Sequence, residues 1–210
     1  MAVIKRGILG GFQNKIANVV GSSWKGIATM RSLPISVANP RTELQVNQRT
    51  KFKTMVKIGS FLLTAWIKPL WDRFAQQESG YNAWLRNNID AFNQNGGTTD
   101  VNWSMSIGTL APVVVDTVVA NSADNSLTVT WNPIPVGDGS PTDRIYIAYV
   151  FEALDRAHGF ASVAARSAGT VTVDFPVDII DNPAARVFVA ARSVDGTKVS
   201  SSYPIYNAAI

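Results

Sequence analysis

Basic side chains dominate the beginning of this chain. Ten lysines and arginines fall among the first 57 residues, where Glu43 is the only acid. The ten are Lys5, Arg6, Lys15, Lys25, Arg31, Arg41, Arg49, Lys51, Lys53 and Lys57. Ammonium and guanidinium groups donate charge-assisted hydrogen bonds to phosphates and carboxylates. The chemistry available here is therefore the binding of an acidic partner, either nucleic acid or the acidic face of another subunit.

The charge is divided unevenly along the chain. Up to Asn95 thirteen bases meet four acids, a net charge of +9, whereas from Gly96 onward six bases meet eleven acids, a net charge of −5. The overall charge of +4 conceals this division. Because an ordinary solvated surface mixes both signs, the one-sided first half favours a partner over simple solvation.

Three of the bases follow one another at intervals of four residues. Arg49, Lys53 and Lys57 would share one face of a helix. Such a stripe can neutralise successive phosphates of a nucleic acid. The plainer interpretation is a solvated face opposite an apolar stripe that includes Phe52 and Val56. The shortage of acids favours a partner, with nucleic acid and protein left as alternatives.

Tryptophans accompany these charges. Trp66, Trp71 and Trp84 occur in helical patterns, where aromatic residues usually belong to the core. Trp24 differs because it stands beside Lys25 near a turn, where an indole can stack on a base or anchor a protein interface. The candidate partner-binding residues are therefore Lys5, Arg6, Lys15, Trp24, Lys25, Arg31, Arg41, Arg49, Lys53 and Lys57.

Residues capable of catalysis are few. The chain has no cysteine and one histidine, His158, which excludes thiolate chemistry and a histidine cluster for a metal. Asp138 and Asp143 could approach a calcium ion, but two carboxylates are few for that ion and a polar turn is favoured. Glu152 and Asp155 could form a glycosidase pair, but no cleft signature accompanies them. The sequence predicts a protein that is not an enzyme and that needs no cofactor or metal.

The first half shows hairpin and helix patterns. Residues 15–33 predict a β-hairpin that turns around Gly21-Ser22-Ser23, and Pro34 ends it. A helix start follows at Asn39 or, one register later, at Thr42. The apolar residues of this helix are Phe52, Val56, Leu63 and Ile67. Two further helices are predicted, one from Pro69 and one over Ser79–Asn93.

The second half consists of short β-strand patterns separated by turn residues. About seven such strands at roughly ten-residue spacing are typical of a β-sandwich. The predicted strands are Trp103–Leu110, Val113–Val119, Ser126–Trp131, Arg144–Phe151, Gly169–Phe175, Arg186–Ala191 and Lys198–Tyr206. The predicted fold class is therefore α+β. A basic β-hairpin with α-helices occupies residues 1–97, and an immunoglobulin-like antiparallel β-sandwich occupies residues 98–210.

Several motifs carry a resemblance to known proteins. The set GILGGF, NVVGSSWKG, MRSLP and NPRTELQVNQRTKF resembles an uncharacterised family of proteins of about this length from Bacteroidota and their bacteriophages. Its last member also resembles a segment of phage structural proteins. The run SLTVTWNP is similar to the second strand of a fibronectin type III or immunoglobulin-like domain. The resemblance implies a phage or prophage setting and an assembly role without enzymatic activity.

These observations predict a structural subunit of a virion, from a phage or a phage-derived particle, that assembles through its basic half. Its partners would be copies of itself, other particle subunits or nucleic acid. The longest apolar stretch, Ile58–Ile67, falls well below the roughly 20 residues of a membrane span, so no span is expected. The expected location is the virion, or the host cytoplasm before assembly. The alternatives are a cytoplasmic nucleic-acid-binding protein of low sequence preference and a surface- or carbohydrate-binding module.

Overall fold

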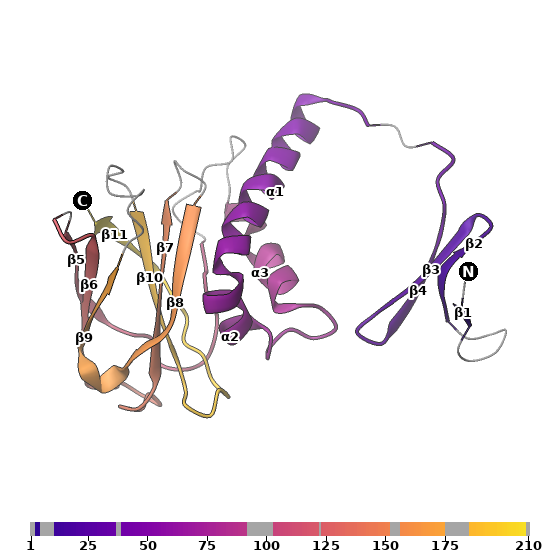
Figure 1. Cartoon of the computed structure of the whole chain (residues 1–210). Helices are drawn as coiled ribbons and strands as arrows, with labels where there is room; N and C mark the ends of the chain where they lie inside the picture. Colours follow the sequence, from indigo (N-terminus) through magenta and orange to yellow (C-terminus); the bar gives the residue numbers. More distant parts are fainter. Residues whose placement is uncertain are drawn as a thin grey trace.

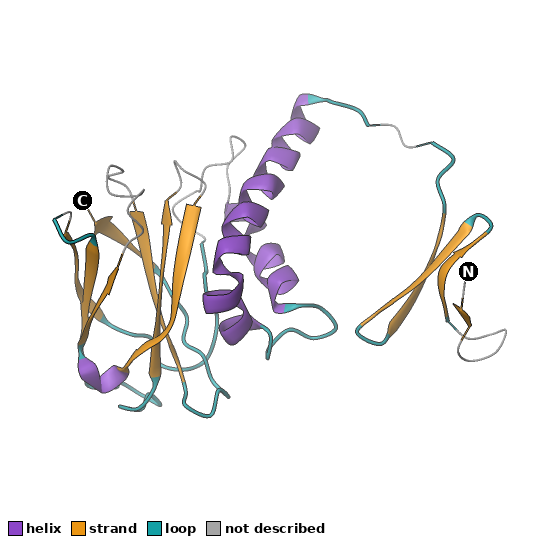
Figure 2. Cartoon of the chain, viewed as in Figure 1, coloured by secondary structure: helices purple, strands orange, loops and turns teal. Residues whose placement is uncertain are grey.

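The architecture is known from a computed structural model of the chain, drawn in Figure 1. It describes residues 3–4, 11–36, 39–91, 103–121, 123–151, 156–174 and 185–208. The described residues form helices and three antiparallel sheets, which agrees with the predicted α+β class. Figure 2 shows that the larger helices lie together, between a small sheet at the N-terminus and two sheets from the second half.

The N-terminal sheet has the strand order β1-β2-β3-β4. Its strands are β1 (Val3–Ile4), β2 (Phe12–Ile16), β3 (Val19–Trp24) and β4 (Ile27–Ser32). The hairpin turn predicted at Gly21 is wrong, because the chain turns at Lys25 and Gly26, whose φ angles are 45° and 85°. Two successive positive φ angles are what a tight hairpin turn requires. Gly21 instead lies within β3, where a Cβ would stand 2.6 Å from the ring of Phe12.

The helical region begins at Thr42, the N-cap of α1 (Glu43–Leu62), so the later of the two predicted starts is confirmed. A π-helix (Leu63–Ile67) leads into α2 (Lys68–Trp71), and α3 (Gly80–Asn88) is capped by Ser79, whose Oγ accepts from the Asn82 amide at 3.2 Å. A 3-10 turn (Ile89–Ala91) follows. Pro69 has no N–H for an α-helical bond, and the wider π-helical turn just before it lets the chain continue in the same direction.

Two sheets make up the second half. One has the order β11-β10-β7-β8 and the other β5-β6-β9. Their strands are β5 (Val115–Asn121), β6 (Ser126–Trp131), β7 (Arg144–Phe151), β8 (Arg156–Ala165), β9 (Thr170–Asp174), β10 (Ala185–Arg192) and β11 (Pro204–Ala208), with a 3-10 turn (Arg166–Ala168) between β8 and β9.

The strand predicted at Trp103–Leu110 is wrong. Within it only Leu110 makes a bridge, to Ser200, although Trp103 and Met105 are buried. Two indoles hold this segment in place, because Trp66 and Trp71 donate from Nε1 to the carbonyl oxygen of Met105 at 3.0 and 2.8 Å. The apolar residues of this segment therefore pack in the core, although the segment does not pair as a strand of a sheet.

The sheet that contains β7 is buried on both of its faces. Ile145, Ile147 and Tyr149 of β7 point into a core shared with the β5-β6-β9 sheet. The alternate residues Tyr146 and Ala148 belong to a second core, built with the helices. The helix-side core takes Met55, Ile58, Leu62, Trp66, Ile67 and Leu70 from the helical region. The helices and the two sheets therefore form three layers in contact.

The close approach of the helices to this sheet depends on a glycine of β8. A Cβ at Gly159 would stand 3.3–3.4 Å from Leu62, Ala65 and Trp66. The division into units at residue 97 stays a prediction. The helix-side core draws on both sides of that position, so a chain cut there would expose apolar surface on each fragment.

A buried ion pair joins the end of β8 to the loop before β7. Arg166 Nη1 lies 3.2 Å from Asp143 Oδ2, and both side chains are 2% exposed. Arg166 Nη2 also donates to the carbonyl oxygens of Ala111 and Pro112, at 2.8 and 2.6 Å. The carboxylate of Asp143 accepts from the Ser140 amide at 2.8 Å. These bonds compensate the cost of removing both charges from water.

We expect Asp143→Ala to lower the free energy of unfolding by about 3–5 kcal/mol, because the guanidinium of Arg166 would stay buried without an opposite charge. Urea denaturation followed by tryptophan fluorescence measures this change. Asp174→Ala, at an exposed position of β9, is the control and should leave the urea midpoint nearly unchanged. If Asp143→Ala lowered the free energy of unfolding no more than Asp174→Ala does, the Arg166–Asp143 pair would not stabilise the fold.

Candidate partner-binding surface

The basic stripe of α1 lies on the side of the helix that faces away from the two sheets of the second half. Met55, Ile58 and Leu62 are fully buried against the β7 sheet, whereas Lys53 and Lys57 are exposed. At 100° per residue, Arg49, Lys53 and Lys57 fall on the opposite side of the helix from that buried stripe. In Figure 1 the N-terminal sheet lies on this other side of α1.

The apolar stripe predicted for this helix is only partly buried. Ile67 is buried, whereas Val56 and Leu63 are half-buried. Phe52 is 50% exposed, so it lies outside the core. Together with Gln48, Arg49 and Lys53 it lines a shallow surface hollow of about 410 Å³. Phe52 lies between the buried face and the basic stripe because a 3.6-residue period carries the core from Met55 to Ile58 and Leu62. The result is an aromatic ring flanked by two cations on an open surface.

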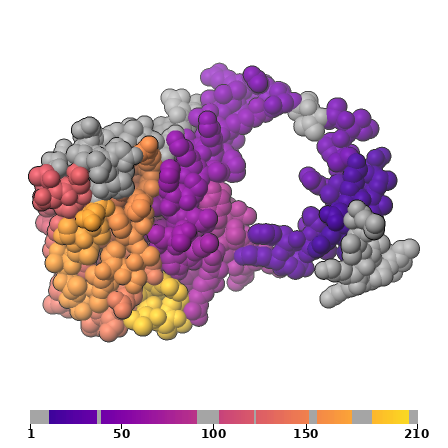
Figure 3. All heavy atoms as spheres, viewed as in Figure 1, coloured from indigo at the N-terminus to yellow at the C-terminus, as the bar shows by residue number. Residues whose placement is uncertain are grey.

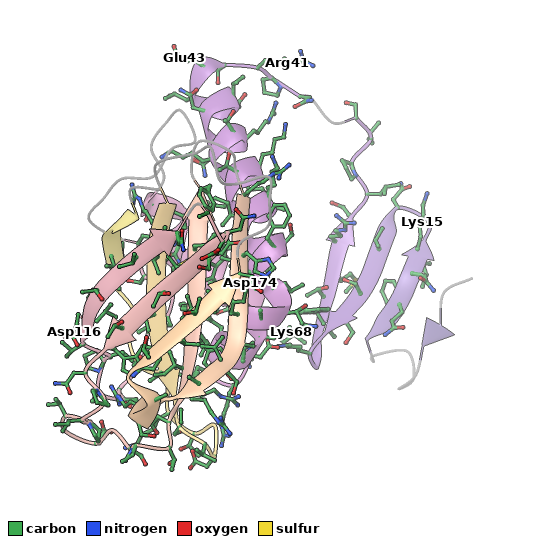
Figure 4. The ribbon with its side chains drawn as sticks, turned by 60° about the vertical axis from the view of Figure 1, so that its left-hand side comes forward. Lys15, Arg41, Glu43, Lys68, Asp116 and Asp174 are labelled. Atoms are coloured by element: carbon green, nitrogen blue, oxygen red, sulfur yellow. The ribbon has the colours of Figure 1, made fainter. Side chains whose placement is uncertain are left out.

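Arg49 is also tied to the chain that precedes the helix. Its Nη2 donates to the carbonyl oxygen of Pro40 at 3.1 Å. Arg41, next to that proline, is exposed, and Figure 4 places it near Glu43 at the N-terminal end of α1. The hydrogen bond ties Pro40 to the first turns of the helix.

One face of the N-terminal sheet combines charge with an aromatic ring. The strand register puts Lys15 opposite Val20, and Val20 opposite Arg31. Side chains of paired residues share a face, so Lys15 and Arg31 flank Val20 in one row across three strands. In the same register Trp24 is opposite Ile27, and alternation places both on this face at the hairpin tip.

The other face of the sheet carries no charge in β3 and β4. It presents Val19, Ala28 and Met30, and Ile16 lies opposite Val19. Met30 is 70% exposed and Ile16 is 42% exposed. None of the described residues of β2, β3 and β4 belongs to either core cluster. Both faces of this sheet are therefore available to a partner.

The candidate residues form two separate groups. Lys15, Trp24 and Arg31 lie on one face of the sheet, while Arg49, Lys53 and Lys57 lie on α1. Figure 3 shows an opening between the N-terminal sheet and α1. Lys25 is at the hairpin turn, and its Nζ donates to the carbonyl oxygen of Glu78. The remaining two candidates, Lys5 and Arg6, lie outside the described residues.

The acids considered for catalysis or metal binding are not brought together. Asp143 is in the buried ion pair, while Asp138 accepts from Lys198 Nζ at 2.7 Å and from the Ala111 amide at 3.0 Å. The hydrogen bond from Lys198 lowers the pKa of Asp138 below its ordinary value. Glu152 and Asp155 lie outside the described residues. The described part of the chain contains no group of three or more potential ligands for a metal ion.

His158 lies among aromatic rings of the β7 sheet. Its ring centroid is 4.7 Å from that of Phe160 and 5.9 Å from that of Tyr149. Burial lowers the pKa of His158, because the charged imidazolium loses water there. The imidazole lies beside these rings on the surface of the sheet, where the residue remains exposed.

Comparison with known proteins assigns most of the described chain to one family. Residues 11–206 match the model of a family of unknown function, DUF6266. The chain belongs to this family. The match begins at Gly11, so β2, β3 and β4 belong to the DUF6266 domain together with the helices and the two later sheets. No curated protein and no solved structure gives a significant match.

One further property concerns membranes. None of the helices in the described part of this DUF6266 chain has both the length and the hydropathy needed to cross a bilayer.

The α1 stripe leads to a prediction about nucleic acid. If it contacts phosphates, replacing Arg49, Lys53 and Lys57 by Gln should flatten the slope of log affinity against log salt by about two to three units, because fewer counterions are released. Titration of a fluorescent single strand at several salt concentrations measures the slope. The control replaces the exposed bases Lys68, Arg73 and Arg144. An equal change in both variants would contradict a specific role for the stripe.

A second prediction concerns His158. Because its pKa is lowered in the folded protein, the unfolded chain takes up a proton more readily, so the free energy of unfolding should fall slightly as the pH drops from about 7 to 5. His158→Gln should reduce this dependence, as measured by urea midpoints. Asp195 contributes little to the pH dependence in this range, because hydrogen bonds from Ser193 and Thr197 lower its pKa to about 2. An unchanged pH dependence in the variant would rule out His158 as its source.

Proposed function

We propose that this protein is a non-enzymatic structural subunit of a phage or phage-derived particle, and that it assembles through its basic N-terminal half. One observation carries the proposal. The N-terminal sheet exposes both of its faces and is connected to α1 by residues 33–42, apart from the two cores (Figure 1).

The energetics of this sheet favour a partner. Of the described residues of β2, β3 and β4, Gly21 alone is buried. Ordering a residue costs roughly 1–2 kcal/mol of backbone entropy, which a sheet normally recovers by burying an apolar face. Val19, Val20, Trp24, Ile27 and Met30 can supply that burial only against another surface. A partner that covers them would stabilise the sheet.

The second half supports a spacing or contact module. Its first, second and fifth strands form one sheet, and its third, fourth, sixth and seventh form the other. This strand order fits the arrangement of immunoglobulin-like and fibronectin type III sandwiches. We propose that fold for residues 103–208. Such a sandwich would carry the assembled N-terminal sheets at a defined distance from one another.

The particle setting is supported by the sequence resemblance. The segment NPRTELQVNQRTKF, which is similar to phage structural proteins, covers the end of the connection and the start of α1. These residues join the connection from the N-terminal sheet to the helical region. The resemblance therefore falls on the part of the chain that the proposal uses for assembly.

Nucleic-acid binding is the second candidate, and it has its own supporting observation. Lys15 and Arg31 form a basic row on the same sheet face as Trp24. Charged groups for the backbone and an aromatic ring for a base are the usual components of a single-strand binding surface. The salt-slope measurement on the α1 stripe can be repeated with Lys15→Gln and Arg31→Gln to test this face.

We expect the full chain to self-associate and a chain that begins at Asn39 to be a monomer, because it lacks the N-terminal sheet but keeps both cores. A cut at residue 60 would be unsuitable, since it would remove Met55 and Ile58 from the helix-side core. Light scattering at two salt concentrations measures the masses. Near-ultraviolet circular dichroism checks that the shortened chain stays folded. A folded, shortened chain that associates as the full chain does would refute the proposal.

A further inference from the structure

A groove runs beside α2, α3 and the segment that precedes β5. Its volume is about 630 Å³, and its lining includes Leu70, Trp71, Phe74, Glu78, Ala83 and Ile107. Leu70 and Ala83 are buried and form an apolar base, while Phe74 and Ile107 are 45% and 48% exposed. Arg86, at 2.7 Å from the carboxylate of Glu78, adds a polar rim. The groove is large enough to accept an aromatic side chain.

The tip of the β3–β4 hairpin has the matching chemistry. Trp24 and Ile27 are paired across the two strands immediately before and after the turn. They are 57% and 39% exposed, so they form an apolar knob without a cover. Lys25, between them at the turn, adds one positive charge. An exposed indole beside a cation is a frequent anchor in protein interfaces.

The tip and the groove already meet at one point. Lys25 Nζ donates to the carbonyl oxygen of Glu78, 53 residues away in the chain. Glu78 is one of four acids among the first 95 residues. The contact reaches only the rim, because Trp24 and Ile27 remain exposed and the groove remains open. The apolar knob therefore lies close to the groove, but neither Trp24 nor Ile27 fills it.

We infer that the groove is the receptor for the hairpin tip of a second copy of this chain, with Trp24 inserted and Lys25 at Glu78. This inference rests on the proposed assembly function and names its contact. The connection of ten residues, 33–42, spans at most about 36 Å. This length is enough for the hairpin tip to leave Glu78 of its own chain and to reach Glu78 of a neighbouring copy. Exchange of one element between identical copies is a low-cost route to association.

The geometry of such an exchange determines the type of assembly. The tip and the groove consist of different residues, so a contact made in one direction between two copies is heterologous. Heterologous contacts produce closed rings or open filaments and do not stop at a dimer unless the exchange is reciprocal. Either outcome suits a repeating structural subunit.

Cysteine cross-linking tests the inference directly, because the chain contains no cysteine of its own. Full-length Lys25→Cys protein with a tag is mixed with untagged Glu78→Cys protein and treated with a short bismaleimide. We expect a covalent product of two chains on a denaturing gel. Glu78→Cys is replaced by Asp174→Cys, on the exposed end of β9, as the control that should give no product.

A second pair of variants tests the role of the indole. Trp24→Ala in the Lys25→Cys background should lower the yield of the two-chain product at least about tenfold, as for a typical anchor residue. Trp24→Phe should retain most of the yield. A yield that does not respond to Trp24→Ala would overturn the insertion of this side chain.

The remaining outcomes separate the receptor from the proposed function. If the full chain associates and loses association without residues 1–38, but gives no Lys25–Glu78 product between chains, the groove is not the receptor and the assembly function stands. If a single chain with both cysteines gives only an internal cross-link at concentrations where it associates, the tip binds its own groove and the inference is wrong. If the full chain never associates, both fail.

Discussion

The layered arrangement of the protein follows from one constraint, which is that the sheet containing β7 must be covered on both of its faces. Strand β7 is apolar through IYIAYVF, and every residue from Ile145 to Phe151 is buried. A strand of this composition cannot expose either face to water without losing the stabilisation that apolar burial provides. The β5-β6-β9 sheet covers one face and the helices cover the other. The order of layers follows from this requirement.

Covering the second face sets the position of the helices. Met55, Ile58 and Leu62 of α1 meet the sheet, and the absence of a side chain at Gly159 lets the helix approach closely. The basic stripe of the same helix must then lie on the outer side. The N-terminal sheet lacks any comparable cover, and its apolar side chains stay exposed in the single chain.

Much of the local structure could be predicted from the sequence. Thr42 and Ser79 marked two helix starts, and the alternation around SLTVTW marked β6. The hairpin turn was misplaced because Gly21-Ser22-Ser23 contains turn residues, although Gly21 serves the close approach of Phe12. Strand β8 was missed because RAHGFASVAA is rich in small residues and is stabilised by its pairing with β7. Phe52 was misassigned because one helix offers several neighbouring apolar stripes, and only packing selects among them.

The candidate site was predictable in composition but not in arrangement. The one-sided charge was evident from the residues, whereas the row formed by Lys15 and Arg31 depends on strand register. The contact between Lys25 and Glu78 joins residues far apart in the chain and has no local signal. The groove had no signal either, because its lining comes from three segments whose apolar residues resemble ordinary core.

The edge position of β4 has a consequence for the chain while it is being synthesised. An open edge strand can pair with another chain and start aggregation, a risk that is greatest during synthesis, when the N-terminal sheet emerges before the helices and the later sheets. Arg31 on this strand and Lys15 two strands away place like charges at matching positions of any two copies. Their mutual repulsion disfavours pairing between identical edges, as charged gatekeeper residues do beside other exposed strands.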